Sequence, residues 1–208
     1  MIPAFVGLLL FATSVIRPTF VVEPGYPPNA VGGGSVVAEL RLTPGTDPDV
    51  RILSGTGVFA ESAKSALQQW RFTTDRKTSV IVVVRFRDPN FYSTGSAAKE
   101  VETGAAEPSL PFPAEIVEPP YPANALGQGS VIIRADVSAS GTVTATEVIK
   151  EAGGLTSASE DAVKGWRFLP ARDTQGGVKC SSVFAVLVFR IPVTAPVRPP
   201  APGTDHAY

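Results

Sequence analysis

Two runs of apolar residues dominate the hydrophobic pattern of the chain, and both predict a buried β-strand. Residues 80–86 read Val-Ile-Val-Val-Val-Arg-Phe, and residues 183–189 read Val-Phe-Ala-Val-Leu-Val-Phe. Short apolar runs that are rich in β-branched and aromatic residues are typical of strands in the core of a sheet.

A helix is predicted before each of these strands. Apolar residues recur at helical spacing from Phe59 to Trp70, and again from Leu155 to Trp166. Each series ends in Trp-Arg-Phe. We expect both tryptophans to be core anchors, because a large aromatic side chain at the end of an apolar helix face buries much area.

The segments upstream of the helices predict two hairpins. In the second half of the chain, strands over residues 130–137 and 142–149 flank the turn signal Ser140-Gly141. In the first half, strands over residues 36–42 and 50–53 flank an irregular turn that contains two prolines.

The chain contains an internal repeat. The sixteen residues from Val22 to Val37 return as Val117 to Ile132 with eleven identities, and Trp-Arg-Phe returns 96 residues after Trp70. Such a repeat predicts one small module built twice. We therefore expect modules over residues 19–87 and 113–192, joined by a flexible linker over residues 88–112 that is rich in small and polar residues.

The predicted fold class is α+β, with two repeated two-layer modules. A right-handed crossover from the second strand of a module places its third strand beside the first. Each module then has a three-stranded antiparallel sheet in the order 2-1-3, with one main helix on one face. The third strand is left at the edge, where a long apolar strand invites pairing with another chain.

Composition narrows the classes of function. The net charge is −1 and Lys and Arg do not cluster, which argues against nucleic acid as a partner. The only histidine is His206 and the only cysteine is Cys180, so we expect no metal, no Ser-His-Asp triad and no cofactor. Cys180 is expected to be a small buried residue. The sequence therefore favours a protein that is not an enzyme.

Both ends of the chain differ in composition from the modules. Residues 1–17 contain an apolar run shorter than the roughly 20 residues of a membrane-spanning helix. We interpret them as a signal-like segment, or as the end of an inner-membrane anchor if more residues precede them, and expect a periplasmic or cell-envelope location. Residues 193–208 form a Pro-rich tail to which no structure is assigned.

The order of these motifs resembles the C-terminal domain of the TonB family. The family pattern is a Tyr-Pro opening, a glycine before a hairpin, a helix ending in Trp-Arg-Phe or Trp-Arg-Tyr, and a closing apolar strand. It begins here at Tyr26-Pro27 and again at Tyr121-Pro122. The second copy keeps the pattern more closely, so we expect it to be the binding copy.

The resemblance implies a periplasmic domain that docks the TonB box of outer-membrane receptors by β-augmentation of its last strand. It also implies energy transduction from an inner-membrane motor complex to nutrient uptake. The partner-binding residues that follow are those of the two closing strands: Val80, Val82, Val84 and Phe86, and Val183, Phe184, Ala185, Val186, Leu187, Val188 and Phe189.

Two other interpretations stay open. The closing strands could pair with each other inside the chain, which would leave a scaffold or adaptor that uses other surfaces. A homodimer is compatible with open edges. Recognition of cell-wall glycan is a weaker third interpretation, because only Tyr26 and Tyr121 offer an aromatic platform. Receptor docking and the scaffold interpretation differ in whether residues 80–86 lie against residues 183–189, because that pairing would remove the docking edge.

Overall fold

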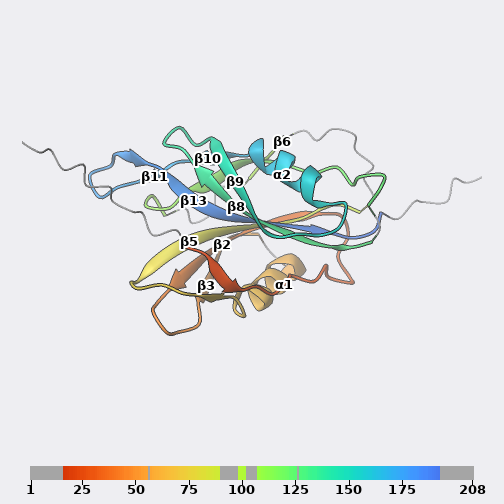
Figure 1. The fold of residues 1–208 in the computed structure, drawn as a ribbon, viewed down its shortest axis with the longest axis horizontal. Helices are drawn as coiled ribbons and strands as arrows, with labels where there is room; N and C mark the ends of the chain where they lie inside the picture. The colour runs from red at the N-terminus through yellow and green to blue at the C-terminus, as the bar shows by residue number, and fades with distance from the viewer. Residues whose placement is uncertain (1–15, 56, 90–97, 102–106, 126, 193–208) are drawn as a thin grey trace, which may run out of the picture.

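The computed structural model describes residues 16–55, 57–89, 98–101, 107–125 and 127–192. Its centre is a mixed six-stranded sheet in the order β3-β2-β5-β13-β8-β9 (Figure 1). The strands are β2 (Gly34–Leu42), β3 (Asp49–Ser54), β5 (Thr78–Phe86), β8 (Gly129–Val137), β9 (Val143–Lys150) and β13 (Ser181–Phe189).

Each half of the sheet has the predicted strand order. In the first half β2 lies between β3 and β5, and in the second half β8 lies between β9 and β13, with all four pairings antiparallel. The order 2-1-3 is therefore confirmed. The helices α1 (Gly57–Leu67) and α2 (Thr156–Lys164) also lie where the apolar spacing places them.

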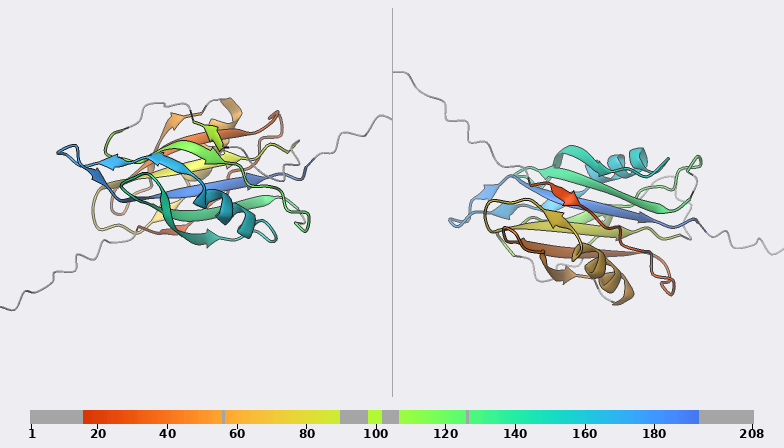
Figure 2. Two further views of the ribbon diagram at one scale, coloured as in Figure 1. Left: turned by 90° about the horizontal axis from the view of Figure 1, so that it is seen from above. Right: turned by 60° about the horizontal axis from the view of Figure 1, so that its bottom comes forward.

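The two halves meet where β5 pairs with β13 in parallel. The register runs from Ile81 opposite Val183 to Phe86 opposite Val188. Both strands are also paired on their other side, β5 with β2 and β13 with β8, and β13 runs through the middle of the sheet in Figures 1 and 2. The prediction that the third strand of each module is an open edge is therefore wrong.

The parallel pairing places α1 and α2 on opposite faces of the sheet (Figure 1). Side chains alternate between faces along a strand. Val80 and Val82 belong to the core cluster under α1, whereas Val183 and Ala185 belong to the cluster under α2. The twofold axis that relates two parallel neighbouring strands is parallel to them and lies in the sheet. Rotation about this axis exchanges the two faces of the sheet, so equivalent residues lie on opposite faces.

The two core clusters contain the two tryptophans. Trp70 packs with Ala63 and Leu67 in one cluster, and Trp166 packs with Leu155 and Val163 in the other. Both indole side chains are fully buried. The prediction that they anchor the core is confirmed. Each tryptophan lies a few residues after the end of its helix and directly before a short strand that begins at Arg71 or Arg167.

Short strands cover the faces of the large sheet beside the helices. β1 (Pro18–Phe20) pairs with β4 (Arg71–Phe72), and β7 (Phe112–Val117) lies between β6 (Ala98–Glu100) and β10 (Arg167–Leu169). β11 (Ala171–Arg172) and β12 (Val178–Lys179) form a hairpin. The expected linker over residues 88–112 thus contains β6, a strand that its composition does not reveal.

Some expectations lie outside the described residues. Residues 1–15 of the signal-like segment and the whole Pro-rich tail over residues 193–208 belong to this group. Neither α1 nor α2, the helices in the described part of the chain, has the length and apolar character needed to cross a bilayer.

Candidate protein-binding site

The residues expected to dock a partner lie in the centre of the molecule. All eleven side chains on the two closing strands are at most 4% exposed. Their backbone groups are engaged on both sides, because each closing strand has two neighbours. Strand addition needs a row of unpaired backbone groups. β5 and β13 therefore offer no docking edge, and the structure contains the alternative, internal pairing of the two strands.

The outer strands of the large sheet are β3 and β9, and neither has the regular edge that favours strand addition. Among the described residues, each pairs with a single strand of this sheet. The β2–β3 ladder carries one irregularity and the β8–β9 ladder carries two. Bulges twist an edge away from an incoming strand and protect it against pairing.

The Tyr-Pro motif has a structural role in both halves. The indole Nε1–H of Trp70 donates to the Val22 carbonyl oxygen at 2.9 Å, and that of Trp166 donates to Val117 at 3.0 Å. The two tyrosine hydroxyls donate to glycine carbonyls six residues on, at Gly32 and Gly127. The repeated aromatic residues thus hold the segment before the first strand against the module.

The junction at which β5 pairs with β13 is called the seam. A repeated glutamate reaches across the seam in each direction. Glu118 of the second half forms an ion pair with Arg85 of the first at 2.7 Å and accepts the Asp88 N–H at 2.8 Å. Glu23 of the first half accepts the Ser130 N–H at 3.0 Å and pairs with Lys150 at 2.7 Å. The sequence showed the recurrence of these glutamates but not that their partners lie in the other half.

Two arginines follow the closing strands and also cross the seam. Arg87 lies over the ring of Tyr121 at 5.8 Å, and Arg190 lies over the ring of Tyr26 at 5.7 Å. Burial lowers the pKa of Arg87, whereas the carboxylate of Glu118 acts in the opposite direction. The signal that could have identified this pair is Phe-Arg at the end of both apolar runs.

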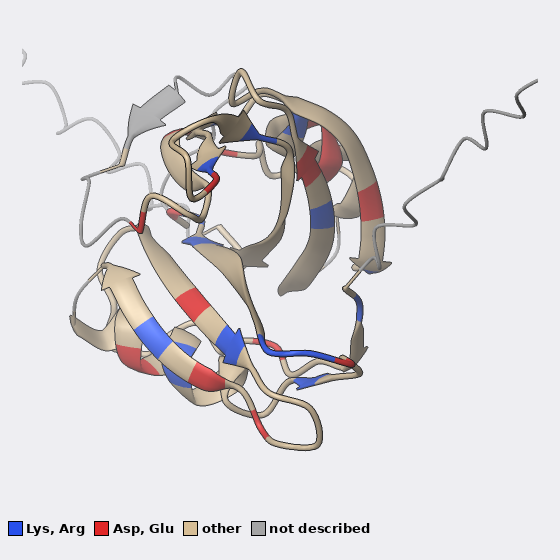
Figure 3. Cartoon of the chain, turned by 90° about the vertical axis from the view of Figure 1, so that its left-hand side faces the viewer, with Lys and Arg blue, Asp and Glu red and all other residues tan. Residues whose placement is uncertain are grey.

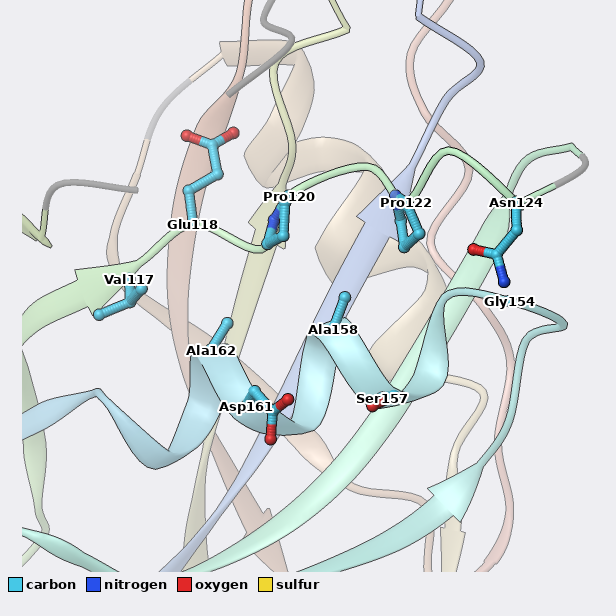
Figure 4. Close-up of a pocket in the computed structure, with 10 residues that line it drawn as sticks. All are labelled: Val117, Glu118, Pro120, Pro122, Asn124, Gly154, Ser157, Ala158, Asp161 and Ala162. Atoms are coloured by element: carbon cyan, nitrogen blue, oxygen red, sulfur yellow. The ribbon is translucent and has the colours of Figure 1, made fainter. Parts of the chain in front are cut away.

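A groove runs beside α2, between the helix and the Tyr-Pro segment of the second half (Figure 4). We call it the α2 groove. Its volume is about 660 Å³, within the range of ligand sites. Ala158 and Ala162 point from the helix towards Pro120 and Pro122, whereas Glu118 points away from it (Figure 4). The remaining lining residues are Val117, Asn124, Gly154, Ser157 and Asp161.

The first half has a hydrogen bond at the position of this groove. The hydroxyl of Ser62, on α1, donates to the carbonyl oxygen of Gly25 at 2.5 Å. The repeat aligns Ser62 with Ala158 and Gly25 with Pro120. Because alanine has no hydroxyl, α2 is not tied to the Tyr-Pro segment at this point, and the groove stays open there.

The described surface shows no arrangement that suggests metal or nucleic-acid chemistry. Acidic and basic residues are interspersed over the elements drawn in Figure 3. No group of three potential metal ligands occurs among the described residues. Cys180 is exposed, so the expectation that it is buried is wrong: it lies beside the β11–β12 hairpin and not in a core strand.

Comparison with family models gives a match to the Gram-negative bacterial TonB protein C-terminal over residues 117–187. Comparisons with curated proteins and with solved structures returned no significant match. The matched residues contain the Tyr-Pro segment, the β8–β9 hairpin, α2, Trp166 and most of β13. TonB C-terminal domains are envelope-associated protein-interaction domains of energy transducers that contact outer-membrane receptors. Residues 117–187 of this chain form a TonB C-terminal-like domain.

Proposed function

We propose that the protein is a cell-envelope adaptor that binds a partner protein through the α2 groove. The supporting observation is the parallel pairing of β5 with β13 in a chain whose residues 117–187 match the TonB C-terminal family. A protein-interaction domain needs an accessible surface, and the closing strands do not provide one. Partner contacts therefore fall to other surfaces of the second half.

The proposal treats the first half as a second copy of the same module. Its support is the repeated Tyr-Pro and Trp-Arg-Phe motifs together with the same strand order. In this arrangement the closing strands join two modules into one unit, as an internal counterpart of a dimer interface. The function requires neither a homodimer nor an inner-membrane motor complex.

The chemistry of the α2 groove suits an extended peptide segment. Its floor is made by small apolar side chains of α2, and proline rings form the opposite wall. Exposed polar residues at the rim, such as Ser157 and Asp161, can fix the orientation of a bound chain. The family suggests the source of the segment, a periplasmic portion of an outer-membrane receptor, which would link the protein to nutrient uptake.

The test is an NMR titration of the full chain with TonB-box peptides from outer-membrane receptors. We expect shift changes at Ala158 and Ala162, while the amides of β13 keep their slow exchange. Binding that perturbs β13 or releases its amides would contradict the proposal, and so would the absence of binding by every peptide.

One pair of variants makes the titration specific. Ala158→Ser copies the hydroxyl that ties Ser62 to Gly25, so it should tie α2 to Pro120 and close the groove. We expect at least a tenfold loss of peptide affinity, about 1.4 kcal/mol. Ser62→Ala makes the reverse change in the other half and should leave affinity unchanged. Equal affinities of the two variants would exclude the α2 groove as the site.

A further inference from the structure

A second pocket lies at the seam, where the closing strand of the second half ends. We call it the seam pocket. Its volume is about 500 Å³, and both halves contribute to it. Tyr26 and Pro28 come from the first half, and Gln128, Phe189 and Arg190 come from the second. It shares no lining residue with the α2 groove.

Arg190 has unused hydrogen-bond donors in this pocket. Its guanidinium lies over the Tyr26 ring at 5.7 Å, and no described residue accepts a hydrogen bond from its side chain or forms an ion pair with it. A guanidinium held over the face of a ring by a cation–π contact keeps its N–H donors, because the ring offers them no lone-pair acceptor. These N–H groups can then reach a bound acceptor.

The equivalent arginine at the other end of the seam behaves differently. Arg87 is 2% exposed, its Nε–H donates to the Pro119 carbonyl at 3.0 Å, and its terminal nitrogen donates to Asp88 at 2.9 Å. Both arginines lie over the ring of the tyrosine of the opposite half. The halves thus place the same side chain in two environments: one is closed by protein acceptors, and the other is open.

The charge of the seam pocket favours an anion. Its carboxylate, that of Glu23, is paired with the Lys150 ammonium at 2.7 Å and accepts the Ser130 N–H. These two charges compensate each other. The Asp88 carboxylate acts on the nearby Tyr26 hydroxyl but does not line the pocket. Among the lining residues that the structure describes, Arg190 is the charged side chain without an ion-pair partner.

We infer that the seam pocket binds a carboxylate carried by an extended peptide. The guanidinium of Arg190 would donate two parallel N–H bonds to the carboxylate, a geometry that arginine provides and lysine does not. Tyr26 holds the guanidinium in place, and the apolar wall formed by Pro24, Pro28 and Val188 contacts the residues beside the acid. This site is independent of the proposed function of the α2 groove.

The experiment measures binding of a capped peptide, acetyl-Ala-Pro-Asp-Pro-Ala-amide, to the full chain by calorimetry and NMR. The matched peptide with Asn in place of Asp should bind at least about tenfold more weakly, because it lacks the charge of the acceptor. A third peptide, acetyl-Ala-Pro-Ala with a free C-terminus, tests whether a terminal carboxylate serves as well as a side chain. Equal binding of the Asp and Asn peptides would overturn the inference. So would the absence of binding by both peptides that carry a carboxylate, the Asp peptide and the peptide with a free C-terminus.

Three variants locate the effect. Arg190→Gln should abolish the preference for the acid, and Arg190→Lys should retain only part of it. Arg76→Gln removes the same charge from an exposed position away from the pocket and should change nothing. If Arg190→Gln unfolds, the site is tested in the unmodified chain by the chemical shift of the Arg190 Nε–H when peptide is added. A shift with the Asp peptide but not with the Asn peptide supports the site, and the absence of a shift overturns it. Ala158→Ser should bind the acid normally, which separates this result from that of the α2 groove.

Discussion

The guanidinium of Arg85 lies 2.7 Å from the carboxylate of Glu118, and the two side chains form a buried ion pair across the seam. Arg85 is on β5 of the first half, whereas Glu118 precedes the Tyr-Pro motif of the second. Both residues are less than a tenth exposed. The seam therefore contains a buried ion pair in addition to the partly exposed contacts of Glu23, and the partners of this pair are separated by more than thirty residues of sequence.

Removal of Glu118 should destabilise the protein strongly. Glu118→Ala leaves the Arg85 charge buried without its carboxylate, and we expect a loss of about 3–5 kcal/mol in the free energy of unfolding. Glu23→Ala, at the repeat-equivalent position, removes a partly exposed pair and one backbone hydrogen bond, so about 1 kcal/mol is expected. Urea unfolding of both variants measures the difference. The double variant Arg85→Met with Glu118→Leu should lose less unfolding free energy than Glu118→Ala alone. Equal losses for Glu118→Ala and Glu23→Ala would contradict the argument that burial makes the Arg85–Glu118 pair the more costly one to break.

The turn between β8 and β9 should tolerate no side chain at Gly141. Its φ is +81°, and a Cβ atom there would lie 1.9 Å from the carbonyl oxygen of Phe168. Gly141→Ala should cost roughly 3 kcal/mol from backbone strain and overlap together. Gly176 has a similar φ of +84° but open space around its Cβ position, so Gly176→Ala should cost about 1–2 kcal/mol. Thermal or urea unfolding compares the two, and similar values would refute the steric argument.

The two halves should unfold together. Trp70 and Trp166 report on opposite faces of the one sheet, and they are the only tryptophans in the chain. Trp70→Phe and Trp166→Phe each leave one reporter and should each cost about 1–3 kcal/mol, because a partly buried carbonyl loses its indole donor. In each variant the fluorescence transition in urea should coincide with the far-ultraviolet circular dichroism transition. Separate midpoints would mean that the modules are independent.

Tyr26 should make the protein more sensitive to alkali. Burial raises the pKa of its hydroxyl above 10, the nearby Asp88 carboxylate acts in the same direction, and the neutral hydroxyl donates to Gly32. The stabilisation is therefore present below about pH 10, the unfolded value, and is lost as pH rises through the higher folded value. The unfolding free energy of wild type minus that of Tyr26→Phe should be constant up to about pH 9 and shrink above pH 10. A difference that stays constant to pH 11 would contradict this assignment.

Local pattern was sufficient for the two helices, for the six strands of the large sheet and for the order of strands within each half, but not for the short strands such as β6. Apolar spacing located α1 and α2, the Ser140-Gly141 turn signal located the β8–β9 hairpin, and the right-handed crossover required the order 2-1-3. The tryptophans were identified as core residues for the same reason, since helical spacing fixes the face on which a residue lies. The repeat also pointed to Glu23 and Glu118 as a related pair without indicating what they contact.

The sequence by itself predicted two similar units, and it determined that each half has a third strand with buried side chains and an anchoring tryptophan. Only the tertiary structure decided what pairs with that strand. An apolar edge strand can pair with a strand from another chain or from the same chain, because backbone hydrogen bonds do not distinguish between the two. Here the partner is the other closing strand, in parallel. That choice placed α1 and α2 on opposite faces, closed one arginine site at the seam and left the other open at Arg190.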